Sequence, residues 1–271
     1  MSTVNLPYID AEIELMEEGG VPPAYLRHFH WGLFDDPTVD DDSAERYFAA
    51  AEAMTHHVVA AAGVSAGARL LDVGCGFGGT LDLVRSRHAG CRLVGLNIDE
   101  RQVRWAGRLV GAGDPVIPFV AADGCRLPVA DGSLDHVLAV ECIFHFPSRK
   151  AFFVEVARVL KPGGTLALSD FLMAPGALAD VASRMSGGDD WYGHMAKPLT
   201  SQGYERLARR TGLEPLSDDD VNTRTLPTYA ALRRLAAEDA SSDGVSSIDG
   251  LEDLAATGDL AYHVLSFRRP G

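Results

Sequence analysis

The chain has 271 residues, of which 46% are hydrophobic and 23% are charged. These values are ordinary for a globular protein, and the length suffices for one large α/β domain or for a domain with a modest appendage. The 24 basic and 38 acidic residues give a formal net charge of −14. Binding to DNA or RNA depends heavily on Lys and Arg side chains that neutralise phosphates, so nucleic acid is disfavoured as a partner.

The cysteines and the N-terminal residues bear on where the protein works. No two of its 4 cysteines have C-x-x-C spacing, which predicts free thiols in a reducing compartment rather than a disulfide framework or a zinc site. The N-terminus has neither the basic region nor the apolar core of a signal peptide. No apolar run approaches the ~20 residues that cross a bilayer. We therefore expect a cytoplasmic protein without a membrane span, acting as a monomer or a homodimer.

The N-terminal part is predicted to be helical. Residues 9–18 have the pattern of a short amphipathic helix that ends at a pair of glycines. Residues 24–34 are rich in aromatic and histidine side chains, and an acidic linker at 35–42 leads to Ser43, a suitable N-cap for a long helix. The acidic linker and a second acidic run at 218–220 lack the ligand spacing of a calcium or zinc site, so we predict no metal.

From Arg69 onward, short apolar runs alternate with helical patterns, as in an open parallel sheet that is covered by helices on both faces. The predicted strands are 69–73, 91–96, 116–121, 136–140 and 165–168, with helices at about 100–110 and 149–160 and another that begins after the glycines at 74–79. The segment 172–198 is irregular. The remaining predictions are a helix at 201–211, a weak strand at 213–216, a helix at 228–237, a mobile loop at 239–250 and a last strand at 260–267.

The centre of this pattern is a strand that turns on glycines into a helix. Gly74, Gly76 and Gly79 satisfy G-x-G-x-x-G, where bare backbone N–H groups come close to a ligand. That spacing alone is weak and is shared with dinucleotide-binding proteins. Asp72, two residues before the first glycine, argues against a pyrophosphate, because its carboxylate repels an anion but holds an ammonium group directly or through water.

Residues Leu71–Gly78 resemble the first motif of the class I S-adenosylmethionine (SAM) dependent methyltransferases. Five motifs follow one another in the order of that family and cover about residues 69–171. The resemblance implies a doubly wound, Rossmann-like, mostly parallel seven-stranded sheet in a single methyltransferase domain. It also implies the division of that domain, which is an N-terminal helical cap at 1–66, a SAM-binding core at 67–171, a lid at 172–198 and the C-terminal part of the sheet at 199–271.

The resemblance also assigns residues to the cofactor, with S-adenosylhomocysteine as the product. Many members have an acidic residue for the ribose hydroxyls where this chain has Asn97, and Asn with a Gln five residues on is similar to the sterol, tocopherol and cyclopropane-forming branch. Asp99 is the rival for that role, with an N-cap as its alternative. Asp123 would accept a hydrogen bond from the adenine amino group. The full predicted set is Asp72, Gly74, Cys75, Gly76, Asn97, Ile98, Gln102, Asp123, Gly124, Glu141 and Tyr25.

The fourth predicted strand ends in Glu141 and His145, for which the resemblance implies chemistry at the transferred methyl group. A histidine with a pKa near ~6.5 accepts a proton from a hydroxyl or amine; packing or helix capping is an equally good account of His145. Glu141 is either a base or a stabiliser of a cation, with a backbone hydrogen bond as its structural alternative. The predicted acceptor-pocket residues are His28, His30, Trp31, Trp191, Tyr192 and His194, for which plain packing is again the alternative.

Together these features predict a methyltransferase that moves a methyl group from SAM to the O, N or C atom of a small molecule, in specialised metabolism. Two alternatives stay open. The enzyme could methylate the carbon of an alkene or prenyl chain through a cation. The fold could also bind SAM without transferring its methyl group, as a pericyclase-like or regulatory protein would.

Overall fold

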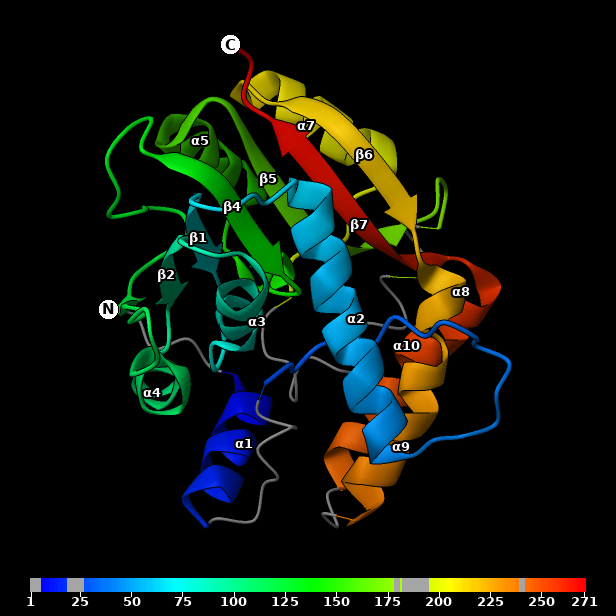
Figure 1. The fold of residues 1–271 in the computed structure, drawn as a ribbon. Coiled ribbons are helices and arrows are strands. Elements are labelled where there is room, and N and C mark those ends of the chain that lie inside the picture. The colour runs from blue at the N-terminus through cyan, green and yellow to red at the C-terminus, as the bar shows by residue number, and fades with distance from the viewer. Residues whose placement is uncertain (1–5, 19–26, 178–180, 182–194, 239–241) are drawn as a thin grey trace.

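The computed structural model describes residues 6–18, 27–177, 181, 195–238 and 242–271. Its centre is a seven-stranded sheet in the order β3-β2-β1-β4-β5-β7-β6, in which β7 runs antiparallel to both of its neighbours (Figure 1). This confirms the predicted doubly wound, mostly parallel sheet. The strands are β1 Arg69–Val73, β2 Arg92–Asn97, β3 Phe119–Ala121, β4 Leu134–Val140, β5 Leu160–Met173, β6 Glu214–Asp220 and β7 Leu260–Arg268.

Helices α2, α3 and α10 lie on one face of the sheet, and α5 and α7 lie on the other (Figure 1). Adjacent strand residues point to opposite faces, so Leu70 packs with the first group and Leu71 with the second. Burial on both faces explains why these strands are almost continuously apolar. The helices are α1 Pro7–Glu17, α2 Ala44–Ala62, α3 Gly79–Arg87, α4 Glu100–Ala106, α5 Arg149–Val159, α7 Ser201–Thr211, α8 Asn222–Thr225, α9 Pro227–Glu238 and α10 Ser242–Thr257, with short helical turns at η1 Gly107–Gly111 and η2 Ile143–His145.

Local signals fixed the start of several helices. The side chain of Ser43 accepts a hydrogen bond from the backbone N–H of Arg46 and so caps α2, as predicted. Helix α2 ends at Gly63, whose φ of +69° is left-handed. Asp99 likewise caps α4 by accepting from the backbone N–H of Arg101 at 2.8 Å.

Several elements differ from the predictions: β6 continues to Asp220 beyond the predicted 213–216, α8 was not predicted, and three further differences have a clear physical reason or position. Residues 242–257 form α10 where a mobile loop was predicted at 239–250, because Leu251, Leu254 and Ala255 recur at helical spacing and are buried. Strand β5 is much longer than the predicted 165–168, since the polar Ser169 and Asp170 are buried and hydrogen-bonded inside the sheet. Strand β3 is shorter than predicted and begins only at Phe119.

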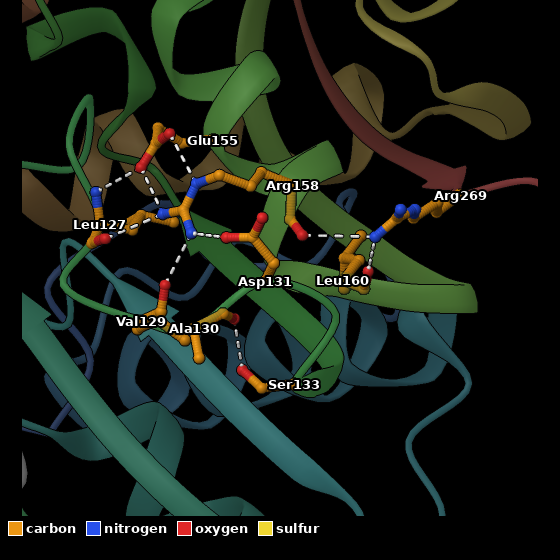
Figure 2. Close-up of polar contacts among 9 residues, drawn as sticks. All are labelled: Leu127, Val129, Ala130, Asp131, Ser133, Glu155, Arg158, Leu160 and Arg269. Carbon is orange, nitrogen blue, oxygen red and sulfur yellow. Dashed lines mark hydrogen bonds and ion pairs between the residues drawn. The ribbon is translucent and has the colours of Figure 1, made fainter.

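The connection between β3 and β4 is tied to α5 by Arg158 (Figure 2). Its guanidinium donates to the carbonyl oxygens of Leu127 and Val129 at 2.9 and 2.7 Å. It also pairs with the carboxylates of Glu155 and Asp131. A planar guanidinium with five donors suits such a fan of acceptors. The cluster holds the chain that follows the end of β3 in one place.

Some further findings concern the described residues alone. The four cysteines are free thiols. In the ranges given above, no helix combines the length and the apolar character needed to cross a membrane. The same ranges contain no group of three or more His, Cys, Asp or Glu side chains arranged to hold a metal ion.

Candidate cofactor and active site

The glycine loop lies between the end of β1 and the start of α3. The backbone N–H of Gly74 donates to the carbonyl of Leu96 in β2 at 2.8 Å. Gly74 has a φ of +76°, and a Cβ added there would lie only 2.5 Å from the Cβ of Cys142. Gly76 has a φ of +49°, and a Cβ added there would have no atom of the described residues within 4 Å. One side of the loop is therefore packed against the strand ends, and bare backbone is open at Gly76.

Asp72 lies in β1 just before this loop and is 1% exposed. Among the residues that the structure describes, neither of its carboxylate oxygens has a hydrogen-bond partner. Burial raises the pKa of Asp72 from 3.8 to about 7. A buried carboxylate without a donor is costly, and an ammonium group placed beside it would supply the missing partner. This feature points to a cationic ligand group at the end of β1.

The end of β2 brings together two of the predicted cofactor residues. The side-chain amide of Asn97 donates to Oε1 of Gln102 at 2.9 Å, and both residues are buried. The Oδ1 atom of Asn97 accepts from the backbone N–H of Asp99 at 3.1 Å. Ile98, between them, is half-buried. Since Asp99 itself serves as the N-cap of α4, the amide pair is the better candidate for a ribose hydroxyl.

Two more predicted cofactor residues follow β3. Asp123 is exposed, and its Oδ1 atom accepts from the backbone N–H of Cys125 at 2.8 Å. Gly124 is buried, and a Cβ added there would lie 3.0 Å from Val73 and 3.2 Å from Phe146. The Arg158 cluster holds the residues that follow them. Asp123 therefore keeps one carboxylate oxygen, Oδ2, available at a fixed turn.

Glu141 follows β4 directly and is half-buried. Its φ of +47° is left-handed, a conformation that glycine adopts more readily than glutamate. Its Oε2 atom accepts from the backbone N–H of Trp31 at 2.8 Å and from the hydroxyl of Tyr262. Burial raises the pKa of Glu141 from 4.5 to about 8, although these two donors act in the opposite direction. A neutral pH therefore leaves Glu141 close to the point at which it gains or loses a proton.

His145 lies four residues further on, at the end of η2. Its Nε2 atom lies 3.1 Å from the hydroxyl of Tyr8 in α1, and the two rings are stacked at 5.8 Å. Tyr8 also stacks with Phe29, with the ring centroids 6.0 Å apart. Met16, further along α1, packs with Phe77 of the glycine loop. Helix α1 thus covers both His145 and the loop.

The segment that contains His28, His30 and Trp31 lies between α2 and the strand ends. Thr55 of α2 places its Oγ1 atom 3.0 Å from Nδ1 of His28 and 2.8 Å from Nε2 of His30. Burial lowers the pKa of His28 to about 3 and that of His30 to about 4, so both rings are neutral. Trp31 is buried and packs against the ring of Phe171 at 5.2 Å. The two histidines therefore face α2, while the backbone of Trp31 reaches Glu141.

Four predicted residues, Tyr25, Trp191, Tyr192 and His194, lie outside the described residues. The chain is described again from Met195, and the backbone N–H of Ala196 donates to the carbonyl of Phe144 at 2.7 Å. Arg149 donates to the carbonyl of Lys197 at 2.9 Å. The end of the predicted lid is thereby attached beside His145.

Sequence reasoning missed several side chains that contact the predicted site residues, among them Tyr8, Thr55, Ser169 and Tyr262. The position of Tyr262 in the sequence could have indicated that it lies near the site. It stands near the start of the predicted last strand, and an antiparallel strand starts at the edge where the parallel strands end. Tyr8 and Thr55 stand in predicted helices, where sequence spacing does not indicate which distant residue they contact.

Comparison with known proteins supports the same kind of cofactor. A family model described as a methyltransferase domain matches residues 71–168. The methyltransferase GfsG of Streptomyces halstedii is 36% identical over 211 residues, which cover 77% of this chain and 73% of that protein. The chain belongs to the class I SAM-dependent methyltransferases. The 27-O-demethylrifamycin SV methyltransferase of Amycolatopsis mediterranei is 35% identical over 210 residues, covering 75% of this chain and 72% of that methyltransferase.

The fold itself is shared more widely. The solved structure of the [4+2]-cyclase SpnF superposes with a TM-score of 0.75, covers 96% of this chain and 92% of its own, and is 24% identical. At that identity the likeness shows the fold alone. The cofactor of this methyltransferase is SAM. The residues present fit SAM, because no described residue gives Asp72 a hydrogen-bond donor and Gly76 exposes bare backbone.

Proposed function

We propose that this methyltransferase acts on a hydroxyl oxygen of an uncharged small molecule. The observation that carries this proposal is the placement of two proton acceptors, His145 and Glu141, after the same strand β4. Methylation of a hydroxyl releases a proton, and an imidazole or carboxylate within hydrogen-bond reach takes it up as a general base. The Amycolatopsis relative is named for methylation of 27-O-demethylrifamycin SV, which agrees with an oxygen as the methylated atom.

The charges around the strand ends favour an uncharged acceptor. Arg149 is committed to Asp170 at 3.0 Å, and Arg101 bonds to Asp99 and Asp10. Arg27 pairs with Asp82 at 2.9 Å. Acceptors with a phosphate or diphosphate need arginine or lysine side chains that are available to the anion. Among the described residues, these three arginines are therefore engaged with carboxylates instead of being available to a phosphate, which supports an uncharged acceptor.

The cofactor would be held at the ends of the first three strands. We propose that Asp72 binds its ammonium group, that bare backbone at Gly74, Cys75 and Gly76 lies along it, and that Asn97 with Gln102 bonds the ribose. Asp123 and Gly124 would meet the adenine. When bound, SAM supplies the methyl group as a sulfonium electrophile. The protein contributes orientation and the exclusion of water by α1 and residues 27–34, which we propose as the cap.

His145 would take the acceptor proton, with Tyr8 holding its ring in place. The hydroxyl of Tyr8 contacts Nε2 of His145 in the described structure, so an acceptor hydroxyl would exchange with it or bond beside it. The free thiols are consistent with the proposed cytoplasmic setting. We propose that the enzyme is a monomer or a homodimer, which sedimentation analysis would test.

The proposal is tested by measuring formation of S-adenosylhomocysteine with a panel of hydroxylated small molecules, beside a prenyl diphosphate as a charged alkene probe. We expect turnover with a hydroxylated acceptor and a loss of about 10²-fold in kcat for His145→Gln, since general bases contribute roughly 10²–10⁴-fold. The matched control is His57→Gln, because His57 also bonds to a side-chain oxygen, that of Asp219 at 2.7 Å, but stands on α2 beside β6.

Several results would contradict the proposal. Methylation of the prenyl diphosphate in preference to all hydroxyls would indicate carbon methylation through a cation. SAM binding with no methyl transfer to any acceptor, and conversion of an unmethylated polyene instead, would indicate a cyclase. Equal losses for His145→Gln and His57→Gln would remove His145 from the reaction.

A further inference from the structure

A cyclic series of hydrogen bonds connects the backbone N–H of Glu141, through Ser169 and Tyr262, to the carboxylate of the same glutamate. The backbone N–H of Glu141 donates to Oγ of Ser169 at 3.0 Å. The Ser169 and Tyr262 hydroxyl oxygens lie 2.9 Å apart, and the Tyr262 hydroxyl donates to Oε2 of Glu141. A phenol has one proton and an ionised carboxylate only accepts, so the proton in the 2.9 Å contact then comes from Ser169.

The two oxygens of this carboxylate differ in their surroundings. Oε2 accepts from two donors, the hydroxyl of Tyr262 and the backbone N–H of Trp31. Oε1 accepts from none of the residues that the structure describes, and the side chain is only half-buried. Two donors aimed at Oε2 leave no room for a proton there, so the neutral carboxyl group carries its proton on Oε1. Oε1 is therefore the atom that exchanges a proton with a ligand.

Tyr262 is held firmly in the position that this requires. It is 0% exposed and stands in β7, paired with Phe171 of β5. The ring of Phe171 meets it edge-on at 4.9 Å, and the ring of Trp31 stacks on it at 6.4 Å. The backbone of Trp31 supplies the second donor to Oε2, so one packed unit sets both contacts.

We propose that Tyr262 is a positioning residue for methyl transfer, which holds Oε2 of Glu141 and thereby presents Oε1 to the bound ligands. The inference rests on the proposed function, because it assumes that Glu141 lies beside the transferred methyl group. It goes beyond that function by assigning a role to a residue of the C-terminal strand. Tyr262 touches Glu141 and not the reacting atoms.

The charged groups near Glu141 act on its ionisation in known directions. Asp170 of β5 raises the pKa of Glu141, and Arg149 of α5 is paired with that aspartate. Cys142, the next residue, has its own thiol pKa raised by burial and stays neutral. The hydrogen bonds from Tyr262 and Trp31 lower the pKa of Glu141 against the larger effect of burial. Loss of the Tyr262 donor therefore raises the pKa of Glu141.

The test measures the protons that are released when ligands bind, by calorimetry in buffers of different ionisation enthalpy between about pH 6 and 10.5. The probes are SAM, which carries a sulfonium charge, and S-adenosylhomocysteine, which does not. The sulfonium favours the ionised form of Glu141, so SAM releases more protons than S-adenosylhomocysteine does around neutral pH. Asp72 contributes equally to both titrations, since both ligands have the same amino-acid group, and its contribution cancels in the difference.

Four variants decide the outcome. Glu141→Gln should abolish the difference between the two ligands. Tyr262→Phe should keep the difference in proton release between the two ligands. The pH midpoint, at which that difference is half-complete, should rise by about one to two units, which is the effect of losing one hydrogen bond to a charged group. Ser169→Ala should move the midpoint in the same direction by less. The matched control, Tyr47→Phe, should leave the midpoint unchanged, because the buried Tyr47 hydroxyl donates to the carbonyl of His30 instead.

Different results would contradict the positioning role of Tyr262 and the proposed place of Glu141 beside the transferred methyl group. A midpoint that Tyr262→Phe and Ser169→Ala both leave unchanged, with the difference still lost in Glu141→Gln, overturns the role of Tyr262 alone. A difference that survives in Glu141→Gln removes Glu141 from the vicinity of the sulfonium, and both proposals about Glu141 fall. An equal midpoint shift in Tyr47→Phe would show a general effect of removing a buried hydroxyl and would also overturn the inference.

Discussion

Two aspartates buried in strands of one sheet have opposite surroundings. Asp170 of β5 is 0% exposed and is fully satisfied, by Arg149 at 3.0 Å, the hydroxyl of Tyr204 and the backbone N–H of Phe171 at 2.9 Å. Asp72 of β1 is 1% exposed, and its carboxylate has no hydrogen-bond partner in the described part of the chain. Burial raises the pKa of both groups, and Asp170 has the guanidinium of Arg149 beside it, whereas no described cation lies beside Asp72. A buried acid with its partners inside the protein serves the fold, and one without partners is available to a ligand.

The largest expected effect follows from breaking the satisfied pair. Asp170→Asn leaves the guanidinium of Arg149 buried without its countercharge, and we expect the free energy of unfolding to fall by about 3–5 kcal/mol in urea. The matched control is Asp131→Asn, which breaks an ion pair with Arg158 in which the Asp131 side chain is 79% exposed. An exposed pair contributes about 0–1 kcal/mol. Equal losses in the two variants would show that burial does not distinguish them.

Replacement of the unpaired acid, Asp72, should change the pH dependence of the free energy of unfolding. In the apoprotein the pKa of Asp72 is about 7, against 3.8 for the unfolded chain. Its contribution to stability is therefore fully present below about pH 4 and is lost as the pH rises through 7, by up to about 4 kcal/mol. Asp72→Asn removes this dependence, so its unfolding free energy should fall less between pH 4 and 8 than that of the parent protein.

The same variant should lose cofactor. Without the carboxylate, the ammonium group of SAM loses a charge-assisted partner, and we expect its dissociation constant to rise about 10–100-fold by calorimetry, or about 1.5–3 kcal/mol. Unchanged SAM affinity in a folded Asp72→Asn protein would remove Asp72 from the cofactor site. A pH dependence identical to that of the parent protein would mean that Asp72 finds a partner in solution.

The smallest effect concerns buried bases rather than acids. Thr55 is 0% exposed and bridges His28 and His30. Thr55→Val keeps the shape of the side chain and removes both hydrogen bonds, at a cost of about 1–2 kcal/mol at pH 7. In the parent protein the lowered pKa values of the two histidines make their contribution full above about pH 6.5 and lost as the pH falls towards 4 and 3. A variant as stable as the parent at pH 7 would show that Thr55 is dispensable.

Much of the fold was predictable because it depends on local patterns. The apolar run at 69–73, the glycines after it and the cap at Ser43 each act within a few residues, and the structure has them as expected. The seven-stranded sheet followed from the family resemblance. Helix α10 was missed because serine and glycine outweighed the apolar spacing of Leu251 and Leu254.

In the candidate site, too, the features that depend on local patterns were predictable and the contacts between distant elements were not. Residues at strand ends were found because parallel strands place their carboxyl ends at one edge. The contact between Tyr262 and Glu141 joins residues 121 positions apart, and that between Thr55 and His28 joins two packed elements. Such contacts depend on how the elements pack, which spacing along the chain does not record. The roles of the site residues themselves remain predictions for the experiments above.

The left-handed backbone of Glu141 implies that selection for stability alone favours a different residue at this position. Glycine or asparagine would adopt a φ of +47° at lower cost, roughly 1 kcal/mol less than glutamate. Either would also remove a half-buried acid from the end of β4. A laboratory population selected only for survival at high temperature should therefore drift away from glutamate at this position. Retention of Glu141 in such a population would need a continuing demand for turnover.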